Sequence, residues 1–159
     1  MLRYPNEQSL EESAGQAARS WRDAGIERLG VGLTGDLGAG KTCFVRAMLR
    51  ALGHDGRVPS PTYTLLEHYD LAGFTFVHLD LYRLKTPQEL ENLGLRDWLS
   101  LPAVWVLVEW PAQSPSLEAA LDLDLRLAVT ADDTRELVPT TRTASGRLAL
   151  ERWLGADIK

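Results

Sequence analysis

A glycine-rich stretch at residues 35–42 limits what this chain can fold into more than any other part of its sequence. It reads GDLGAGKT, which fits the pattern G-x-x-x-x-G-K-T of a loop whose backbone N–H groups cradle phosphate. Its flanks suit that role, because residues 29–34 form a short apolar run of strand length and residues 43–52 form a helical run that Gly53 can end. A strand, a glycine loop and a helix in this order predict a nucleoside triphosphate site rather than a chance turn before a helix.

The loop also carries two side chains that a bound triphosphate requires. Lys41 is expected to reach the β- and γ-phosphates as a point charge, and the Thr42 hydroxyl is expected to ligate Mg²⁺. The predicted nucleotide contacts of the loop and of the helix start are Gly35, Asp36, Leu37, Gly38, Ala39, Gly40, Lys41, Thr42 and Cys43. Cys43 is the single cysteine, which excludes a disulfide within the chain.

Two acidic residues, Asp80 and Glu109, stand at the ends of apolar runs of strand length. An open α/β sheet places its ligands beyond the carboxyl ends of its strands, so both residues are candidates for the catalytic and metal site. We favour Asp80 as the acid that holds Mg²⁺, directly or through water, and Glu109 as the acid that positions the attacking water, because glutamate reaches further from the sheet. The swapped assignment remains open, as does a role for either acid as the cap of a neighbouring helix.

Two further segments are candidates for nucleotide contacts. Ser60 and Thr62 flank Pro61 in a loop rich in glycine and proline, and their hydroxyls are expected to close on the γ-phosphate and Mg²⁺, although a plain turn is the alternative. Trp110 follows Glu109 directly, where its ring packs either on the nucleotide site or within the protein. His54, His68 and His78 show no metal-ligand spacing, so we expect neither a metal nor a catalytic role for them.

The remaining pattern predicts one α/β domain over residues 1–159 with the P-loop NTPase fold, in which helices flank a mostly parallel central sheet with antiparallel hairpin additions. Residues 103–109 are apolar until the last, as in a central parallel strand, whereas residues 121–129 alternate as in a half-exposed strand. Further strands are expected at residues 62–70, 74–81 and 135–140, and helices at residues 9–24, 87–92, 95–99 and 145–154. Ser9 is the expected cap of the first helix, and Leu148, Trp153 and Leu154 are the expected buried residues of the last.

Composition narrows the class of protein further. Of the 159 residues 45% are apolar and 25% charged, and the net charge is −5 without a cluster of lysine or arginine. A protein that holds nucleic acid by itself usually shows a basic face, so any contact with RNA is expected to be indirect. No apolar run reaches the length of a membrane span and no export signal is evident, which predicts a cytoplasmic protein.

Four motifs in order, GDLGAGKT, SPTYTL, HLDLYRL and VEWP, make the chain resemble the TsaE (YjeE) family. The resemblance runs from about residue 11 to residue 110. Members of that family are bacterial ATPases required for the threonylcarbamoyladenosine (t6A) modification of tRNA. They act with a TsaD-type modification enzyme and its TsaB-type companion, and they do not transfer the carbamoyl group themselves.

The resemblance assigns expected roles to residues of this chain. It implies ATP and Mg²⁺ as the cofactors of residues 35–42, and a switch-like loop at residues 60–64. It also implies that Asp80 lies on the metal side, that Tyr82 and Arg83 are further motif residues, and that Glu109 and Trp110 are needed for activity. Cys43 replaces a more usual Thr or Ser, and Ser13 replaces a usual Thr, so we carry over no adenine contact to Ser13.

Two other functions compete with an accessory ATPase in tRNA modification. One is a small-molecule kinase, since chains of this length with a phosphate loop often phosphorylate nucleosides or metabolites. Such kinases usually carry an arginine-rich lid, whereas the arginines here are scattered through the C-terminal part. The other is a binding module that responds to nucleotide and hydrolyses it only incidentally.

Overall fold

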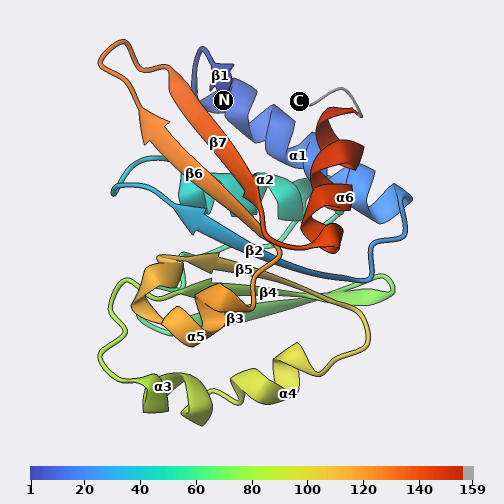
Figure 1. Ribbon diagram of the computed structural model, residues 1–159, viewed down its shortest axis with the longest axis vertical. Coiled ribbons are helices and arrows are strands. Elements are labelled where there is room, and N and C mark those ends of the chain that lie inside the picture. The colour runs from blue at the N-terminus through green and yellow to red at the C-terminus, as the bar shows by residue number, and fades with distance from the viewer. Residues whose placement is uncertain (156–159) are drawn as a thin grey trace.

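A seven-stranded β-sheet in the order β1-β7-β6-β2-β5-β4-β3 forms the centre of the protein in the computed structural model, which describes residues 1–155 (Figure 1). The strands are β1 (Leu2–Tyr4), β2 (Arg28–Thr34), β3 (Leu66–Leu71), β4 (Phe74–Asp80), β5 (Val104–Glu109), β6 (Leu123–Val129) and β7 (Arg135–Thr141). Four neighbouring strands, β6, β2, β5 and β4, run parallel, whereas the pairs β3–β4, β6–β7 and β1–β7 are antiparallel. The expected antiparallel hairpin additions are present as β3–β4 and β6–β7, but the sheet is mixed rather than mostly parallel, because β1 also pairs antiparallel with β7 at one edge.

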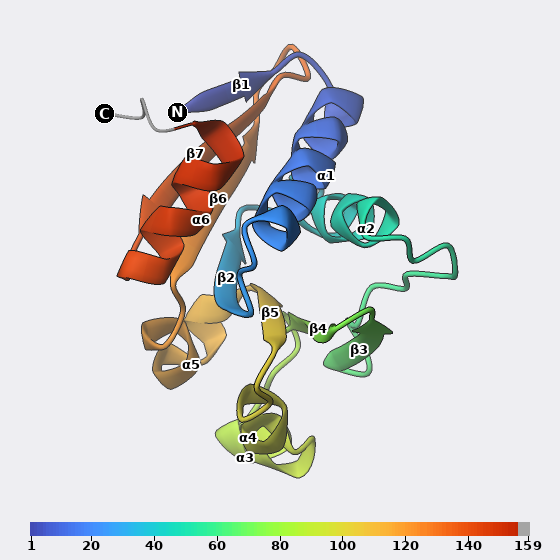
Figure 2. The same ribbon diagram turned by 90° about the vertical axis from the view of Figure 1, so that its right-hand side faces the viewer.

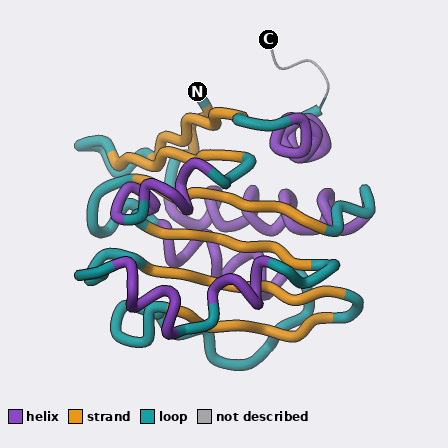
Figure 3. The backbone as a smooth tube through the Cα atoms, turned by 60° about the horizontal axis from the view of Figure 1, so that its bottom comes forward, coloured by secondary structure: helices purple, strands orange, loops and turns teal. Residues whose placement is uncertain are grey.

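Helices cover both faces of this sheet (Figures 2 and 3). They are α1 (Glu7–Asp23), α2 (Lys41–Ala51), α3 (Pro87–Asn92), α4 (Leu95–Leu99), α5 (Pro115–Ala119) and α6 (Ala144–Leu154), with a short 3₁₀ helix, η1, at Pro111–Gln113. Helices α1, α2 and α6 pack on one face, and α3, α4 and α5 pack on the other. Within the described residues, none of these helices combines the length and apolar character needed to cross a membrane.

The larger core lies between the sheet and helices α1, α2 and α6. Strand β5 is buried along its whole length, as its continuous apolar run predicts. Trp105 on β5 meets Trp21 of α1 edge to face, with their ring centroids 5.8 Å apart, and Trp21 meets Trp153 of α6 in the same way at 6.2 Å. These contacts hold α1 against β5 and α6 against α1.

The structure corrects the expected starts of helix α1 and strand β3 and the expected burial of Leu148. Helix α1 begins at Glu7, and Asn6 caps it, so that Ser9 is the third helical residue and donates back to the cap. Strand β3 begins only at Leu66, because the residues before it form a turn. In α6, Leu148 is 41% exposed, and its neighbour Ala149 faces the core instead. Sequence reasoning also missed β1 and α5.

The topology brings the carboxyl ends of β2, β4 and β5 to one edge of the sheet. Asp80 at the end of β4 is the register partner of Glu109 at the end of β5, and Glu109 is in turn the partner of Leu33 on β2. The phosphate loop starts one residue after β2 ends. The two acids and the loop therefore lie side by side, as the rule for open α/β sheets predicts.

Candidate active site

The loop at residues 35–42 has the backbone that its glycines permit. Gly35 has a φ of 140°, and a Cβ there would lie 2.2 Å from the backbone oxygen of Leu127, so a larger residue would clash. Gly40 is the N-cap of α2 with a φ of 103°, and within residues 1–155 no side-chain hydrogen bond caps the start of that helix. The first N–H groups of α2 thus remain free to bind an anion, and the partial positive charge of the helix favours one.

Lys41 is held in place by the loop's own carbonyl groups. Its Nζ donates to the backbone oxygens of Gly35, at 2.6 Å, and Asp36, at 2.9 Å. Burial lowers the pKa of Lys41, and the nearby carboxylates of Glu109 and Asp80 oppose that shift. Lysine has three N–H donors and no acceptor, so a phosphate group can compete directly for these bonds.

Thr42 and Glu109 meet across the loop. The Thr42 hydroxyl donates to Glu109 Oε1 at 2.9 Å. His78 Nε2 lies 2.8 Å from the same oxygen, in a contact that sequence reasoning missed. The signal for His78 is its position two residues before Asp80, which places both side chains on one face of β4. The predicted metal ligand Thr42 is therefore in direct contact with one of the two predicted acids.

Asp80 is bound to the loop at residues 60–62 rather than to Thr42. Its Oδ2 accepts from the hydroxyls of Thr62, at 3.1 Å, and Ser60, at 3.4 Å. Its Oδ1 accepts from the backbone N–H of Tyr82 at 3.0 Å. Asp80 is 4% exposed, so these bonds compensate for the burial of its charge. The loop whose hydroxyls are expected to meet the γ-phosphate is thus attached to an acid of the site.

These side chains line one pocket of about 520 Å³. The lining residues are Glu7, Leu37, Gly38, Gly40, Lys41, Thr42, Cys43, Ser60, Thr62, Asp80, Tyr82, Arg83, Glu109 and Trp110. Most of the residues expected to contact nucleotide are among them, whereas Gly35, Asp36 and Ala39 do not line the pocket. Ser13 does not line the pocket; its hydroxyl lies 2.9 Å from the hydroxyl of Tyr4.

Aromatic side chains form the rim of the pocket. The Trp110 ring lies 4.4 Å from Lys41 Nζ and packs on Tyr82, with centroids 5.0 Å apart. Trp110 has a φ of 58°, a conformation that costs free energy in a bulky residue. The guanidinium of Arg83, which also lines the pocket, lies 4.5 Å from the centroid of the Tyr63 ring, and Tyr63 is 82% exposed. Trp110 thus contacts the site lysine directly.

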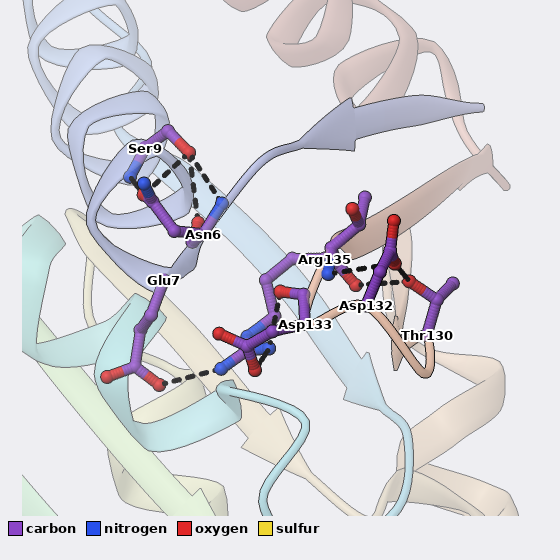
Figure 4. A network of polar contacts seen from close by, with 8 residues as sticks. Asn6, Glu7, Ser9, Thr130, Asp132, Asp133 and Arg135 are labelled. Carbon is purple, nitrogen blue, oxygen red and sulfur yellow. Dashed lines mark hydrogen bonds and ion pairs between the residues drawn. The ribbon is translucent and has the colours of Figure 1, made fainter.

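The start of α1 also reaches the pocket, through Glu7. Glu7 lines the pocket beside Cys43, and its carboxylate lies 3.7 Å from the guanidinium of Arg135, which also binds Asp133 at 2.7 Å (Figure 4). Burial, followed by the Glu7 carboxylate, raises the pKa of the Cys43 thiol and so disfavours a reactive thiolate. The local sequence does not predict that Glu7 belongs to the pocket, because its partner Arg135 lies far away along the chain, on β7.

The donor set suits Mg²⁺. Thr42 offers a hydroxyl, and Glu109 and Asp80 offer carboxylates, all of which are hard oxygen ligands. Among the described residues, no hydrogen bond is made by the second carboxylate oxygen of Glu109. The pocket thus presents the kinds of groups that a triphosphate and a divalent cation require.

Comparisons with known proteins show which family the chain resembles. The sequence model of the family described as "Threonylcarbamoyl adenosine biosynthesis protein TsaE" matches residues 4–137. A relative from Haemophilus influenzae, named tRNA threonylcarbamoyladenosine biosynthesis protein TsaE, is 42% identical over 115 residues, which cover 72% of each chain. A protein of the same name from Rickettsia felis is 40% identical over 111 residues, which cover 69% of this chain and 61% of that one. The crystal structure of Bacillus subtilis YdiB matches with a TM-score of 0.72 at 25% identity, covering 96% of this chain and 91% of YdiB.

Proposed function

Because this chain belongs to the TsaE family and has a role in the biosynthesis of t6A in tRNA, we propose that it fulfils that role as a Mg²⁺-dependent ATPase. The observation that carries the proposal is the contact of the Thr42 hydroxyl with Glu109 beside a loop with a free helix N-terminus. In P-loop NTPases a hydroxyl in this position and a nearby acid hold Mg²⁺, while the loop lysine neutralises the phosphates. Lys41, Thr42 and Glu109 supply these groups here.

We assign Glu109 to the metal side of the site and Asp80 to the loop, which is the assignment that the sequence left as the alternative. Thr42 and Glu109 would hold the ion together, since their side chains are in direct contact through a hydrogen bond. Asp80 instead accepts from Ser60 and Thr62. With ATP and Mg²⁺ bound, the hydroxyls of Ser60 and Thr62 would turn from Asp80 to the γ-phosphate, which would leave the Asp80 carboxylate facing the pocket.

The chain's own residues account for binding and for positioning of water. Lys41 and the first N–H groups of α2 hold the phosphates, and Trp110 covers Lys41 from solvent. Bound Mg²⁺ would neutralise charge on the β- and γ-phosphates. The carboxylates of Glu109 and Asp80 orient water at the pocket face of the two strands.

We further propose that the ATPase is an accessory subunit in the cytoplasm, acting with TsaD-like and TsaB-like proteins and meeting tRNA only through them. The net charge of −5 without a basic cluster supports an indirect contact with RNA. Within residues 1–155, Arg83 is the single arginine that lines the pocket, and it stacks on Tyr63 rather than on the phosphate loop. That arrangement lacks the arginine-rich lid of a small-molecule kinase.

We predict that the isolated chain hydrolyses ATP slowly and that the TsaD-like and TsaB-like proteins of the same cell raise its turnover. Transition-state charge at the γ-phosphate is incompletely neutralised by the lone subunit, and a partner can supply or order the missing cation. The measurement is phosphate release with and without the partners, at saturating ATP and Mg²⁺. Fast turnover that the partners leave unchanged would contradict the accessory role.

The same assay separates the proposed ATPase from a kinase. We expect phosphate release to match ATP consumption whether or not nucleosides or metabolites are added. Consumption of ATP with transfer of its γ-phosphate to an added acceptor would establish the kinase alternative instead.

A further inference from the structure

His78 is a fully buried polar residue beneath the two acids of the site. It is 0% exposed and lies on β4, where it pairs in register with Leu107 of β5. Its imidazole reaches along the strand pair to Glu109, with Nε2 2.8 Å from Oε1. Its neighbour two residues earlier on the same face is Phe76, which belongs to the apolar core. Burying an imidazole in such surroundings costs free energy unless its polar atoms are satisfied.

The chemistry of the contact fixes the proton on His78. A carboxylate only accepts hydrogen bonds, so Nε2 must be the donor. The Thr42 hydroxyl donates to the same Glu109 oxygen. His78 Nδ1, by contrast, is buried without a hydrogen-bond partner among the described residues. His78 therefore makes one hydrogen bond to Glu109 while its second ring nitrogen stays unsatisfied. An apolar residue at this position would avoid the cost of burying that nitrogen.

The double contact has a consequence for the other oxygen of Glu109. Donors on two sides, from β4 and from the start of α2, hold Oε1. Glutamate has three side-chain torsions, and a carboxylate anchored through one oxygen presents the other in a fixed direction. Glu109 lines the pocket, and its Oε2 makes no hydrogen bond within the described part of the chain. Oε2 is thus the oxygen available to water or to a cation.

We propose that His78 is a positioning residue, whose Nε2–H holds Glu109 Oε1 so that Oε2 is presented to the nucleotide pocket. The inference rests on the proposed ATPase function, since it assigns the binding of cation or water by Glu109 to one carboxylate oxygen, Oε2. It does not require His78 to touch nucleotide, metal or water. When Thr42 turns towards a bound ion, the His78 contact is the one that still anchors the carboxylate.

The first test compares His78→Leu, which removes the donor, with His78→Gln, whose amide nitrogen stands as many bonds from Cβ as Nε2 does. In the complex with the partner proteins, His78→Leu is expected to lower kcat by about tenfold to a hundredfold with little change in KM for ATP, as for the loss of an orienting partner. His78→Gln is expected to restore most of that loss. His68→Leu is the matched control, since His68 lies on the neighbouring strand β3 and stacks on Trp98, away from Glu109.

A second test separates positioning from a general loss of stability. In a Glu109→Ala background there is no carboxylate to orient, so adding His78→Leu is expected to cause no further loss of turnover. The ¹H–¹⁵N spectrum of the histidine side chains reports the contact without any ATPase assay. It is expected to show a protonated Nε2 of His78 that exchanges slowly, and Glu109→Ala is expected to shift that signal.

The outcomes are distinct. Wild-type kcat in a folded His78→Leu variant, or equal losses in the Leu and Gln variants, would overturn the inference while the ATPase function stands. If His78→Leu does not fold, the turnover of His78→Gln and the side-chain spectrum test the proposal instead. A His78 signal that Glu109→Ala leaves unchanged would overturn it. If the wild-type complex hydrolyses no ATP, the proposed function fails, even where the spectrum confirms the contact.

Discussion

Lys41→Ala is expected to weaken ATP binding by about a hundredfold or more and to leave the protein folded. The ammonium of Lys41 makes charge-assisted bonds, each of which contributes about 1.5–3 kcal/mol where it is buried, and these pass to the phosphates when the nucleotide binds. The side chain belongs to the loop and not to the apolar core, where α2 contributes Phe44, Val45, Met48 and Leu49. Its loss therefore removes phosphate contacts without creating a core cavity.

The measurement is ATP affinity by calorimetric titration in the presence of Mg²⁺, beside a thermal unfolding curve. Lys85→Ala is the matched control, because Lys85 precedes α3 and does not line the pocket. Its ATP affinity is expected to equal that of the wild type. An unchanged affinity in Lys41→Ala would remove the basis for assigning the loop to phosphate binding.

Glu109→Gln is expected to lower turnover by roughly a hundredfold or more while ATP still binds, as for the loss of a positioned acid–base group. Glutamine keeps the size of the side chain and an oxygen that accepts from Thr42 and His78. It loses the negative charge that attracts Mg²⁺ and orients water. Because we place Glu109 on the metal side, the Mg²⁺ concentration needed for half-maximal binding of ATP is also expected to rise.

Asp80→Asn provides the comparison. Asparagine retains an oxygen for the hydroxyls of Ser60 and Thr62, so the loop stays attached, but the charge facing the γ-phosphate is lost. We expect lower turnover with a smaller change in Mg²⁺ dependence than in Glu109→Gln. The reverse pattern across a Mg²⁺ titration would return the metal role to Asp80. Wild-type turnover in Glu109→Gln would leave Glu109 without a catalytic or metal role.

The parts of the fold that the sequence predicted are those encoded by local pattern. The phosphate loop needs glycines at fixed spacing, and β5 needs an unbroken apolar run. Both can therefore be predicted from neighbouring residues alone. The strand ends that carry Asp80 and Glu109 follow from the same runs. Their register across two strands, by contrast, is a property of the sheet, which is why the sequence did not settle which acid meets Thr42.

The parts that were missed depend on partners far away along the chain. His78 looks like one polar residue in an apolar strand until β5 places Glu109 within reach. Glu7 joins the pocket because Arg135, at the start of β7, lies close to the beginning of α1. Strand β1 has three residues, too few to show an alternating pattern, and it forms by pairing with β7. Tertiary contact, and not local propensity, decides each of these features.

The most direct test of the ATPase proposal is a reconstituted modification reaction. The TsaD-like and TsaB-like proteins of the same cell, a tRNA substrate and ATP are combined with the wild-type chain, with Glu109→Gln, or with no added chain, and t6A formation is followed beside phosphate release. We predict repeated rounds of modification with the wild type, and neither sustained modification nor rapid phosphate release with Glu109→Gln, although that variant still binds ATP. Equal t6A formation in all three reactions would contradict the proposal that ATP hydrolysis at this site supports the modification.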